Sequence, residues 1–296
     1  MESPVLKDRL QRLGGRLAAQ PIPPIAASED PKLAELLARI ARLKGRARLA
    51  HAGATEATLA DRLGGEVVTP GLIRVARSFP LWHKLGRVSL ASLLRTRAET
   101  LPADPARCLF LDTETTGLAG GSGTLAFMIG IGRLQLSSTE FGGSGKFILR
   151  QYLISGFGAE GAMLDALAQD VNDGDCLVTF NGKSYDLPLL ATRYRLLGRT
   201  NPLPGLAHLD LRHPLRRIYG KQFTDCRLKT LEEQVLGHRR DNDLPGSEAP
   251  KAWLAWLKRR EMSMLAEVAR HNRGDVLAMA GLCHCLGVRE TAELVC

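Results

Sequence analysis

Two acidic residues separated by a single residue close an apolar run, and they are the first candidates for chemistry. The run reads LFLDTETTGL from Leu109 to Leu118, and its acids are Asp112 and Glu114. If the run is a β-strand, its side chains alternate between faces, so both carboxylates project from the same side. Two like charges so close repel each other unless a cation lies between them. The spacing indicates a metal site, although a charged turn after a buried strand is the simpler reading of this pair alone.

Two later segments place further acids at the ends of expected elements. In TFNGKSYDLPLL, Asp186 follows a strand-like run and begins a helical one, where the helix dipole favours an anion. A helix N-cap explains Asp186 alone more simply. In RHNRGDVLAM, His271 and Asp275 are four residues apart and share one helix face, as an exposed ion pair also would. Because all four acids lie at element ends that one fold can bring together, we predict a common site.

The pattern of apolar residues predicts an α/β layer fold. The runs CLFLD, TLAFMIGIGRLQL and KFILRQYLI, separated by turns rich in glycine and serine, predict three antiparallel strands. Strands CLVTFN and LAHLDL then alternate with helical segments, which predicts parallel pairing. We expect a mixed five-stranded sheet flanked by helices in three layers. We assign this domain to residues 100–296, and a basic N-terminal extension, helical and partly linker, to residues 1–99.

Composition narrows the class of protein and its partners. The chain has 296 residues, 45% of them hydrophobic, which is enough for a sizeable core. Residues 1–100 contain 17 Lys and Arg against 9 Asp and Glu, a net +8, and the remainder contains 23 against 22. Such an excess attracts polyanions, so nucleic acid is the expected partner and anionic lipid the weaker alternative. We expect a cytoplasmic protein with reduced cysteines and no membrane association. Protein partners are not indicated.

Three motifs resemble a known group of enzymes. DTETTG, NGKSYD and HNRGD match, in this order, the three exonuclease motifs of the DEDD superfamily of ribonuclease H-like nucleases. FPLWHKLGRVSLASLL, TETTGLAGGSGTLAFMIGIG, HLDLRHPLRRIYG and DLPGSEAPKAWLAWLKRR resemble the bacterial YprB-type ribonuclease H-like family. The histidine-type branch of the superfamily places its His five residues before the last Asp, and the tyrosine-type branch places a Tyr four before it. This chain has Arg270 and His271 at those positions.

The resemblance implies a ribonuclease H-like fold and a metal-dependent 3′-5′ exonuclease that acts on RNA or DNA by a two-metal mechanism. Two Mg²⁺ or Mn²⁺ ions suit carboxylate ligands, and His271 is the candidate general base. The implied metal ligands are Asp112, Glu114, Asp186 and Asp275. The implied substrate contacts are the backbone at Thr115, Thr116 and Gly117 and the side chains of Asn181 and Tyr185. For Tyr185, packing is an equal alternative.

Two other functions stay open. One is a nucleic-acid-binding protein that keeps the fold but turns over little or nothing, which the presence of all four acids opposes. The other is a structure-specific endonuclease that uses the same metals, which nothing in the sequence excludes. Three residues around HLDLRH, namely His208, Arg212 and His213, either line the substrate groove or form structural ion pairs, and we favour ion pairing.

Removal of the chain up to about residue 99 is expected to weaken nucleic-acid binding and to flatten its salt dependence, because this segment carries +8 of the net +9. Fluorescence anisotropy with a labelled oligonucleotide at several salt concentrations measures both quantities. Truncation before Ser78 is the cleaner variant, because the apolar residues of FPLWHKLGRVSL can pack on the domain. An unchanged salt slope would assign the basic excess to solubility alone.

Overall fold

A computed structural model of the chain describes residues 54–96, 101–102, 104–117, 123–136, 145–241 and 243–293, with side chains described as far as residue 288. The chain divides into two units, Met1–Ala52 and Gly53–Cys296. The first unit lies wholly outside the described residues. The helix and linker expected in that part of the N-terminal extension therefore lie outside them too.

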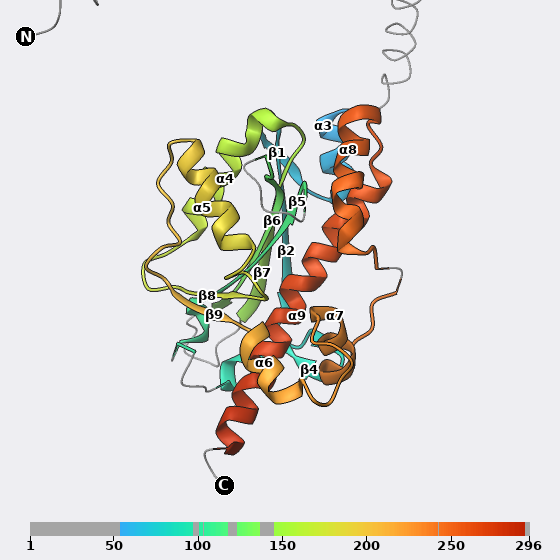
Figure 1. The fold of residues 1–296 in the computed structure, drawn as a ribbon. Helices are drawn as coiled ribbons and strands as arrows, with labels where there is room; N and C mark the ends of the chain where they lie inside the picture. The colour runs from blue at the N-terminus through green and yellow to red at the C-terminus, as the bar shows by residue number, and fades with distance from the viewer. Residues whose placement is uncertain are drawn as a thin grey trace, which may run out of the picture. The chain divides into compact units, whose positions relative to one another are not determined.

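Seven strands form one mixed sheet in the order β1-β2-β7-β6-β5-β8-β9 (Figure 1). Their bounds are Glu66–Thr69 (β1), Leu72–Pro80 (β2), Cys108–Thr115 (β5), Ala126–Leu136 (β6), Gly145–Ile154 (β7), Cys176–Thr179 (β8) and Ala207–Asp210 (β9). β5, β6 and β7 pair in antiparallel fashion, whereas β8 runs parallel to β5 and to β9. The predicted meander and the parallel pairing after it are both confirmed. Lys84–Leu85 (β3) and Val88–Ser89 (β4) form a separate two-stranded sheet.

The sheet has two strands more than the five that we expected, and both come from the segment assigned to the N-terminal extension. β2 pairs with β7 along its whole length, from Leu72 to Pro80, and β1 pairs with β2. The boundary expected at residue 99 therefore cuts through the sheet. It was drawn from charge, which does not report strand pairing. A truncation that spares the sheet ends at residue 52, and it removes 10 Lys and Arg against 5 Asp and Glu, or +5 of the +9.

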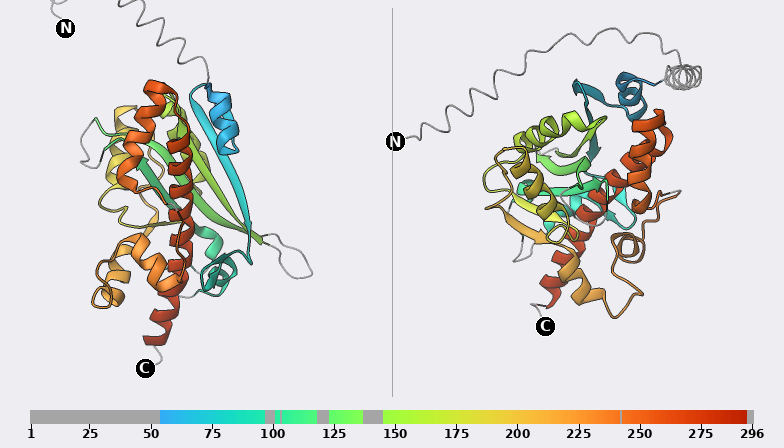
Figure 2. Two further views of the ribbon diagram at one scale, coloured as in Figure 1. Left: turned by 90° about the vertical axis from the view of Figure 1, so that its right-hand side faces the viewer. Right: turned by 45° about the horizontal axis from the view of Figure 1, so that its top comes forward.

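Helices cover both faces of the sheet. Their bounds are Glu56–Leu63 (α3), Glu160–Asp170 (α4), Asp186–Leu196 (α5), Arg212–Tyr219 (α6), Leu228–Leu231 (α7), Ala249–Arg259 (α8) and Ser263–Glu293 (α9). Short 3-10 helices span Leu90–Arg95, Pro105–Arg107, Phe157–Ala159 and Gly246–Glu248, and a π-helical turn spans Glu232–Leu236. Figures 1 and 2 show α4 and α5 on one side of the sheet and α9 along the other. The three expected layers are confirmed.

The long helix α9 fixes one face of the core. Val276, Met279 and Cys283 are fully buried at helical spacing and belong to the same apolar cluster as Phe110 of β5 and Phe147 of β7. The opposite face of β5 packs in a second cluster with residues of α4 and α5. Because α9 also contains the HNRGD motif, this packing sets where the motif's side chains lie relative to β5.

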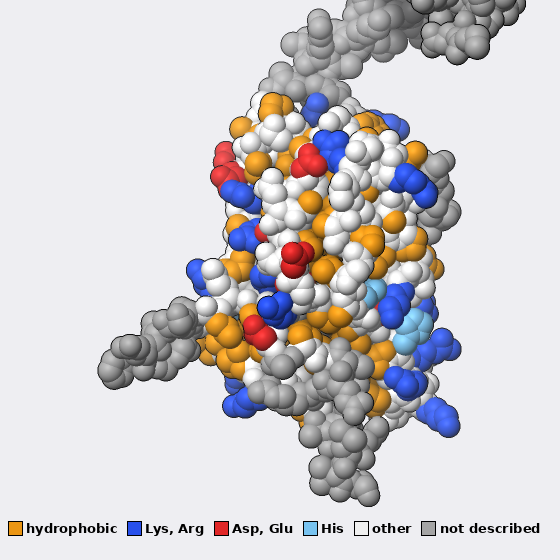
Figure 3. Space-filling model, turned by 90° about the vertical axis from the view of Figure 1, so that its left-hand side faces the viewer, with side chains coloured by type: hydrophobic (Ala, Val, Ile, Leu, Met, Phe, Trp, Pro, Cys, Tyr) orange, Lys and Arg blue, Asp and Glu red, His pale blue; other side chains and the backbone are white. Residues whose placement is uncertain are grey.

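The surface is mixed in charge. Seen from the side of α4 and α5, it carries a few separated acidic side chains, while Lys and Arg gather toward the lower right with His beside them (Figure 3). Among the helices of the described residues, none is long and apolar enough to cross a membrane.

A glycine in β6 allows α9 to approach the sheet closely. Gly130 lies opposite Asp112 in the β5–β6 pairing. A Cβ atom at Gly130 would lie 2.2 Å from Oδ1 of Asn272, which is fully buried on α9. Asn272 therefore reaches β5 only because residue 130 has no side chain.

Replacement Gly130→Ala is expected to lower the free energy of unfolding by about 1–3 kcal/mol, because the methyl group overpacks a buried contact. Urea denaturation measures the change. Gly158→Ala is the matched control, since a Cβ there meets nothing within 4 Å. Equal stability of the two variants would show that α9 does not need this close approach.

Candidate active site

The predicted pair Asp112 and Glu114 lies in the last half of β5, where the strand extends beyond its neighbour. The β5–β8 pairing ends at Phe110, so the next residues of β5 have no partner on that side. Glu114 is 6% exposed. Among the described residues, its carboxylate forms neither a hydrogen bond nor an ion pair. A buried carboxylate without a partner is costly, which indicates a group that a bound cation would stabilise.

Asp112 is held by an amide network from α9 and β7. Asn272 donates through Nδ2 to Oδ2 of Asp112 at 2.8 Å, and Gln151 donates through Nε2 to Oδ1 of Asn272 at 2.8 Å. Gln151 also donates to the backbone carbonyl of Ala269 at 2.7 Å. Both amides are buried. Sequence reasoning missed both residues; the position of Asn272 beside His271 inside the third motif was the available signal.

Asp186 is the first residue of α5 and is 8% exposed. It reaches β5 through Thr113, whose Oγ1 donates to Oδ1 of Asp186 at 2.5 Å. Burial raises the pKa of Asp186 to about 6, although the hydrogen bonds from Thr113 and the helix backbone oppose the rise. The expected position at a helix start is confirmed. The second motif therefore delivers a carboxylate next to the strand that carries the first.

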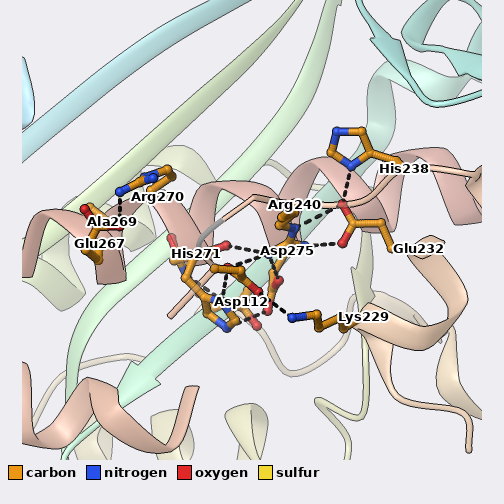
Figure 4. Close-up of polar contacts among 12 residues, drawn as sticks. Asp112, Lys229, Glu232, His238, Arg240, Glu267, Ala269, Arg270, His271 and Asp275 are labelled. Atoms are coloured by element: carbon orange, nitrogen blue, oxygen red, sulfur yellow. Dashed lines mark hydrogen bonds and ion pairs between the residues drawn. The ribbon is translucent and has the colours of Figure 1, made fainter. Parts of the chain in front are cut away.

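Asp275 and His271 share one face of α9 as expected, and Nε2 of His271 lies 3.5 Å from Oδ2 of Asp275. Two residues that sequence reasoning missed hold them. Arg240 places Nη1 2.6 Å from Oδ1 of Asp275 (Figure 4). Asp243 places Oδ1 2.9 Å from Nδ1 of His271. Both come from the irregular segment before α8, and neither belongs to one of the three motifs that we recognised.

Arg240 is itself fixed by a buried acid. Glu232, at the start of the π-helical turn, is 1% exposed, and its Oε2 lies 2.7 Å from Nη2 of Arg240. Figure 4 shows Arg240 between Glu232 and Asp275. Burial lowers the pKa of Arg240, but Asp275 and Glu232 outweigh burial and raise it. The guanidinium therefore stays charged beside the carboxylates.

Asp112 and Glu114 are two carboxylates whose pKa responds to the other acids. Burial raises the pKa of Asp112 well above its usual range, and repulsion from Asp275, Glu114 and Asp186 raises it further. Burial likewise raises the pKa of Glu114, with Asp275, Asp186 and Asp243 adding to it. This mutual repulsion is the condition that divalent cations relieve.

The described part of the chain contains no group of three or more His, Cys, Asp or Glu side chains already arranged to hold a metal ion. In this arrangement Arg240 engages Asp275. The residues nevertheless fit a divalent cation in two respects. Their carboxylate oxygens are the hard donors that Mg²⁺ and Mn²⁺ prefer. A bound cation would also relieve the repulsion among the acids and neutralise the unpartnered carboxylate of Glu114.

A cavity of about 600 Å³ opens beside Asp112 and Asp186. Its lining contains Asp112, Thr113, Thr115, Gly117, Thr124, Phe180, Asn181, Ser184, Tyr185, Asp186, Pro188, Leu189 and Thr192. Four of the five predicted substrate contacts are in this set. The fifth, Thr116, instead pairs with Leu125 through its backbone N–H and its hydroxyl. Tyr185 is 58% exposed, so packing in the core is not its role.

Asn181 is held in a backbone conformation that few side chains adopt, with φ of 67°. Its N–H donates to Oδ1 of buried Asp210 at 2.7 Å, and its own Oδ1 accepts from Nη1 of Arg212 at 2.6 Å. The ion pair that we favoured for Arg212 is not found among the described residues. His213 is exposed and lines none of the cavities described here.

Comparison with known proteins agrees with this geometry. Residues 109–286 match the family described as the RNase_H superfamily, which is more than half of the chain. The chain belongs to the RNase_H superfamily. The α/β sheet with flanking helices is the ribonuclease H-like fold that the motifs implied.

A curated relative supports the more specific resemblance. The chain is 33% identical over 216 residues to "Uncharacterized protein YprB" of Bacillus subtilis (strain 168), a match that covers 69% of this chain and 50% of the relative. The resemblance to the YprB-type ribonuclease H-like family is confirmed. The chain spans about half the length of this relative.

Without divalent cations, the stability of the protein is expected to fall as the pH rises from about 4 to above 6. An unfolded aspartate releases its proton near its ordinary pKa of 3.8, whereas folded Asp186 keeps it to about 6. The folded state therefore binds more protons in this window, and Asp186 alone loses roughly 3 kcal/mol of stabilisation across it. Thermal unfolding in EDTA measures the change.

The test variant is Asp112→Asn, which removes one of the repelling charges, and Asp165→Asn is its control. In EDTA this variant should gain stability relative to the wild type as the pH rises, and Asp165→Asn, whose side chain is half exposed beside Arg199, should not. Added Mn²⁺ should raise the melting temperature of the wild type more at about pH 7 than at about pH 5. A difference between Asp112→Asn and wild type that does not change with pH would contradict the clustering.

Proposed function

We propose that this protein is a metal-dependent 3′-5′ exonuclease of the DEDD type that hydrolyses phosphodiester bonds of RNA or DNA. One observation carries the proposal: Asp112 and Asp186 line one cavity, and Glu114 and Asp275 lie near enough to raise the pKa of Asp112. Membership of the RNase_H superfamily supports a nuclease that uses divalent metal ions and a nucleic-acid substrate. The order of the three motifs supports the DEDD type.

The four carboxylates are the residues that would hold two Mg²⁺ or Mn²⁺ ions. When bound, such ions activate a water molecule and stabilise the charge on the leaving oxygen. Asp112 is oriented for this role by Asn272, and Asp186 by Thr113. Since Arg240 neutralises part of the charge of Asp275, it also limits how much repulsion the site carries before cations bind.

His271 is the proposed general base. Its Nδ1 faces Asp243 at 2.9 Å, so Nδ1 carries the proton in the neutral ring and Nε2 remains free to accept one. Nε2 lies on the side of Asp275, where the attacking water would be held. Asp243 thus supports the assignment of His271 although the spacing in the motif is that of the tyrosine-type branch.

The cavity lining supplies the proposed contacts to the terminal nucleotide. Backbone groups near Thr115 and Gly117 border the carboxylates, and Asn181 lies in the same wall. The exposed ring of Tyr185 offers a face on which a base can stack, a contact worth about 1–3 kcal/mol in single-strand binding proteins.

Incubation of the purified protein with RNA and DNA labelled at the 3′ or the 5′ end, in Mg²⁺, Mn²⁺ or EDTA, tests the proposal. We expect metal-dependent release of mononucleotides from the 3′ end of the strand. Internal cuts would replace the exonuclease with an endonuclease that uses the same residues. If the protein binds nucleic acid but cleaves it with neither Mg²⁺ nor Mn²⁺, it is a nucleic-acid-binding protein with a ribonuclease H-like fold.

Asp112→Asn is expected to abolish metal-dependent hydrolysis while nucleic-acid affinity stays near the wild-type value, because it removes a ligand charge at constant side-chain volume. The other three acids should behave alike, and losing all four should cost no more than losing one. Asp165→Asn is the control away from the cavity. Full activity of Asp112→Asn would exclude the site.

His271→Ala is expected to lower kcat by about 10²–10⁴-fold with little change in KM, because a general base acts in the transition state. Steady-state kinetics on a labelled oligonucleotide separate the two constants. His213→Ala, which changes an exposed histidine of α6 outside the cavities, should keep wild-type rates. A wild-type kcat in His271→Ala would leave activation of the water to the metals alone.

A further inference from the structure

A second cavity adjoins the one that contains the carboxylates. It measures about 540 Å³, and Phe180 and Asn181 line both cavities. The remaining lining residues include Arg212, Arg216, Asp225 and Arg227. The two cavities therefore share a wall at the end of β8. A chain molecule in the first cavity can continue past Asn181 into the second.

The second cavity is basic. Arg212 and Arg216 are one turn apart on α6, and Arg227 is 84% exposed on the opposite segment. Among the described residues, neither Arg212 nor Arg216 forms an ion pair with a carboxylate. Figure 3 shows Lys and Arg side chains gathered on the side of the molecule where α6 lies.

The acids nearby are already engaged. Asp225 accepts from the hydroxyl of Thr230 at 2.6 Å and from the backbone N–H of Arg227 at 3.0 Å. Asp210 is buried and accepts from three backbone N–H groups, those of Asn181, Lys183 and Arg212. Three guanidinium groups against one lining carboxylate leave a net positive cavity.

One of the arginines is linked to the first cavity. Nη1 of Arg212 donates to Oδ1 of Asn181 at 2.6 Å, across the shared wall. The positive φ of Asn181, fixed by its N–H bond to Asp210, holds that wall in place. These hydrogen bonds fix the position of the basic cavity relative to the cavity that contains the carboxylates.

We propose that this second cavity binds backbone phosphates of a single nucleic-acid strand whose 3′ end lies beside the carboxylates. The inference rests on the proposed function and adds a binding subsite to it. Guanidinium groups match phosphate oxygens in geometry and charge. The continuity of the cavities favours a strand that spans both over a free phosphate ion.

Arg216 and Arg217 provide a matched pair for the test. They are adjacent on α6, both are exposed, and only Arg216 lines the cavity. Affinity of the full chain for a labelled single-stranded oligonucleotide is measured by anisotropy in EDTA at several low salt concentrations, so that turnover does not interfere. Arg216→Ala should weaken binding several-fold and reduce the slope of log K against log salt by about 0.7, the value for one phosphate of a single strand. Arg217→Ala should change both much less.

Equal effects of the two substitutions, or no effect of either, would overturn the subsite, because long-range charge then explains the binding. A second readout uses hydrolysis in Mn²⁺. Arg216→Ala should raise KM for a long oligonucleotide and leave a dinucleotide unaffected, and a KM raised for both would also overturn it. The outcomes separate the two proposals. If the protein hydrolyses nucleic acid but Arg216→Ala binds the oligonucleotide as tightly as the wild type, only the proposed subsite is wrong. If Arg216→Ala loses affinity and Arg217→Ala does not, but the wild type shows no hydrolysis, only the proposed nuclease activity is wrong.

Discussion

The arrangement of this protein depends on the repulsion among carboxylates that the fold buries together. Asp112, Glu114 and Asp186 come from β5 and α5, and Asp275 comes from α9 on the other side of β5. Burial raises the pKa of the first three, and repulsion from the other carboxylates adds to it for Asp112 and Glu114. A chain that only had to fold would gain by replacing such a cluster with apolar side chains. Their presence together therefore indicates a function that needs concentrated negative charge.

Buried polar side chains on the neighbouring strands and helices partly offset the repulsion among the carboxylates. Asn272 and Gln151 donate in series toward Asp112, and the missing side chain of Gly130 makes room for Asn272. Arg240 bridges Glu232 and Asp275. Glu114 alone is left without a partner among the described residues. The site is thus partly compensated, which keeps the protein folded while leaving room for a cation.

The sequence predicted the parts of the site that are local and periodic. A strand ending in D-x-E, an acid at a helix start and a His–Asp pair at helical spacing were all readable from short stretches, and so were the strands β5 to β9. Arg240, Asp243 and Gln151 were not readable, because each acts through residues distant in the chain. β1 and β2 were missed for a related reason: residues 66–80 are basic and irregular in pattern, and only their pairing with β7 makes them part of the sheet.

A crystal structure of the protein with Mn²⁺ shows whether the carboxylate cluster is a divalent-cation site. Anomalous scattering locates manganese without reference to activity or to the choice of substrate. We expect two peaks about 3.5–4 Å apart, bounded by Asp112, Glu114, Asp186 and Asp275, with Asp275 turned from Arg240 toward the ions. Saturating Mn²⁺ that leaves no peak among these four residues would contradict this expectation.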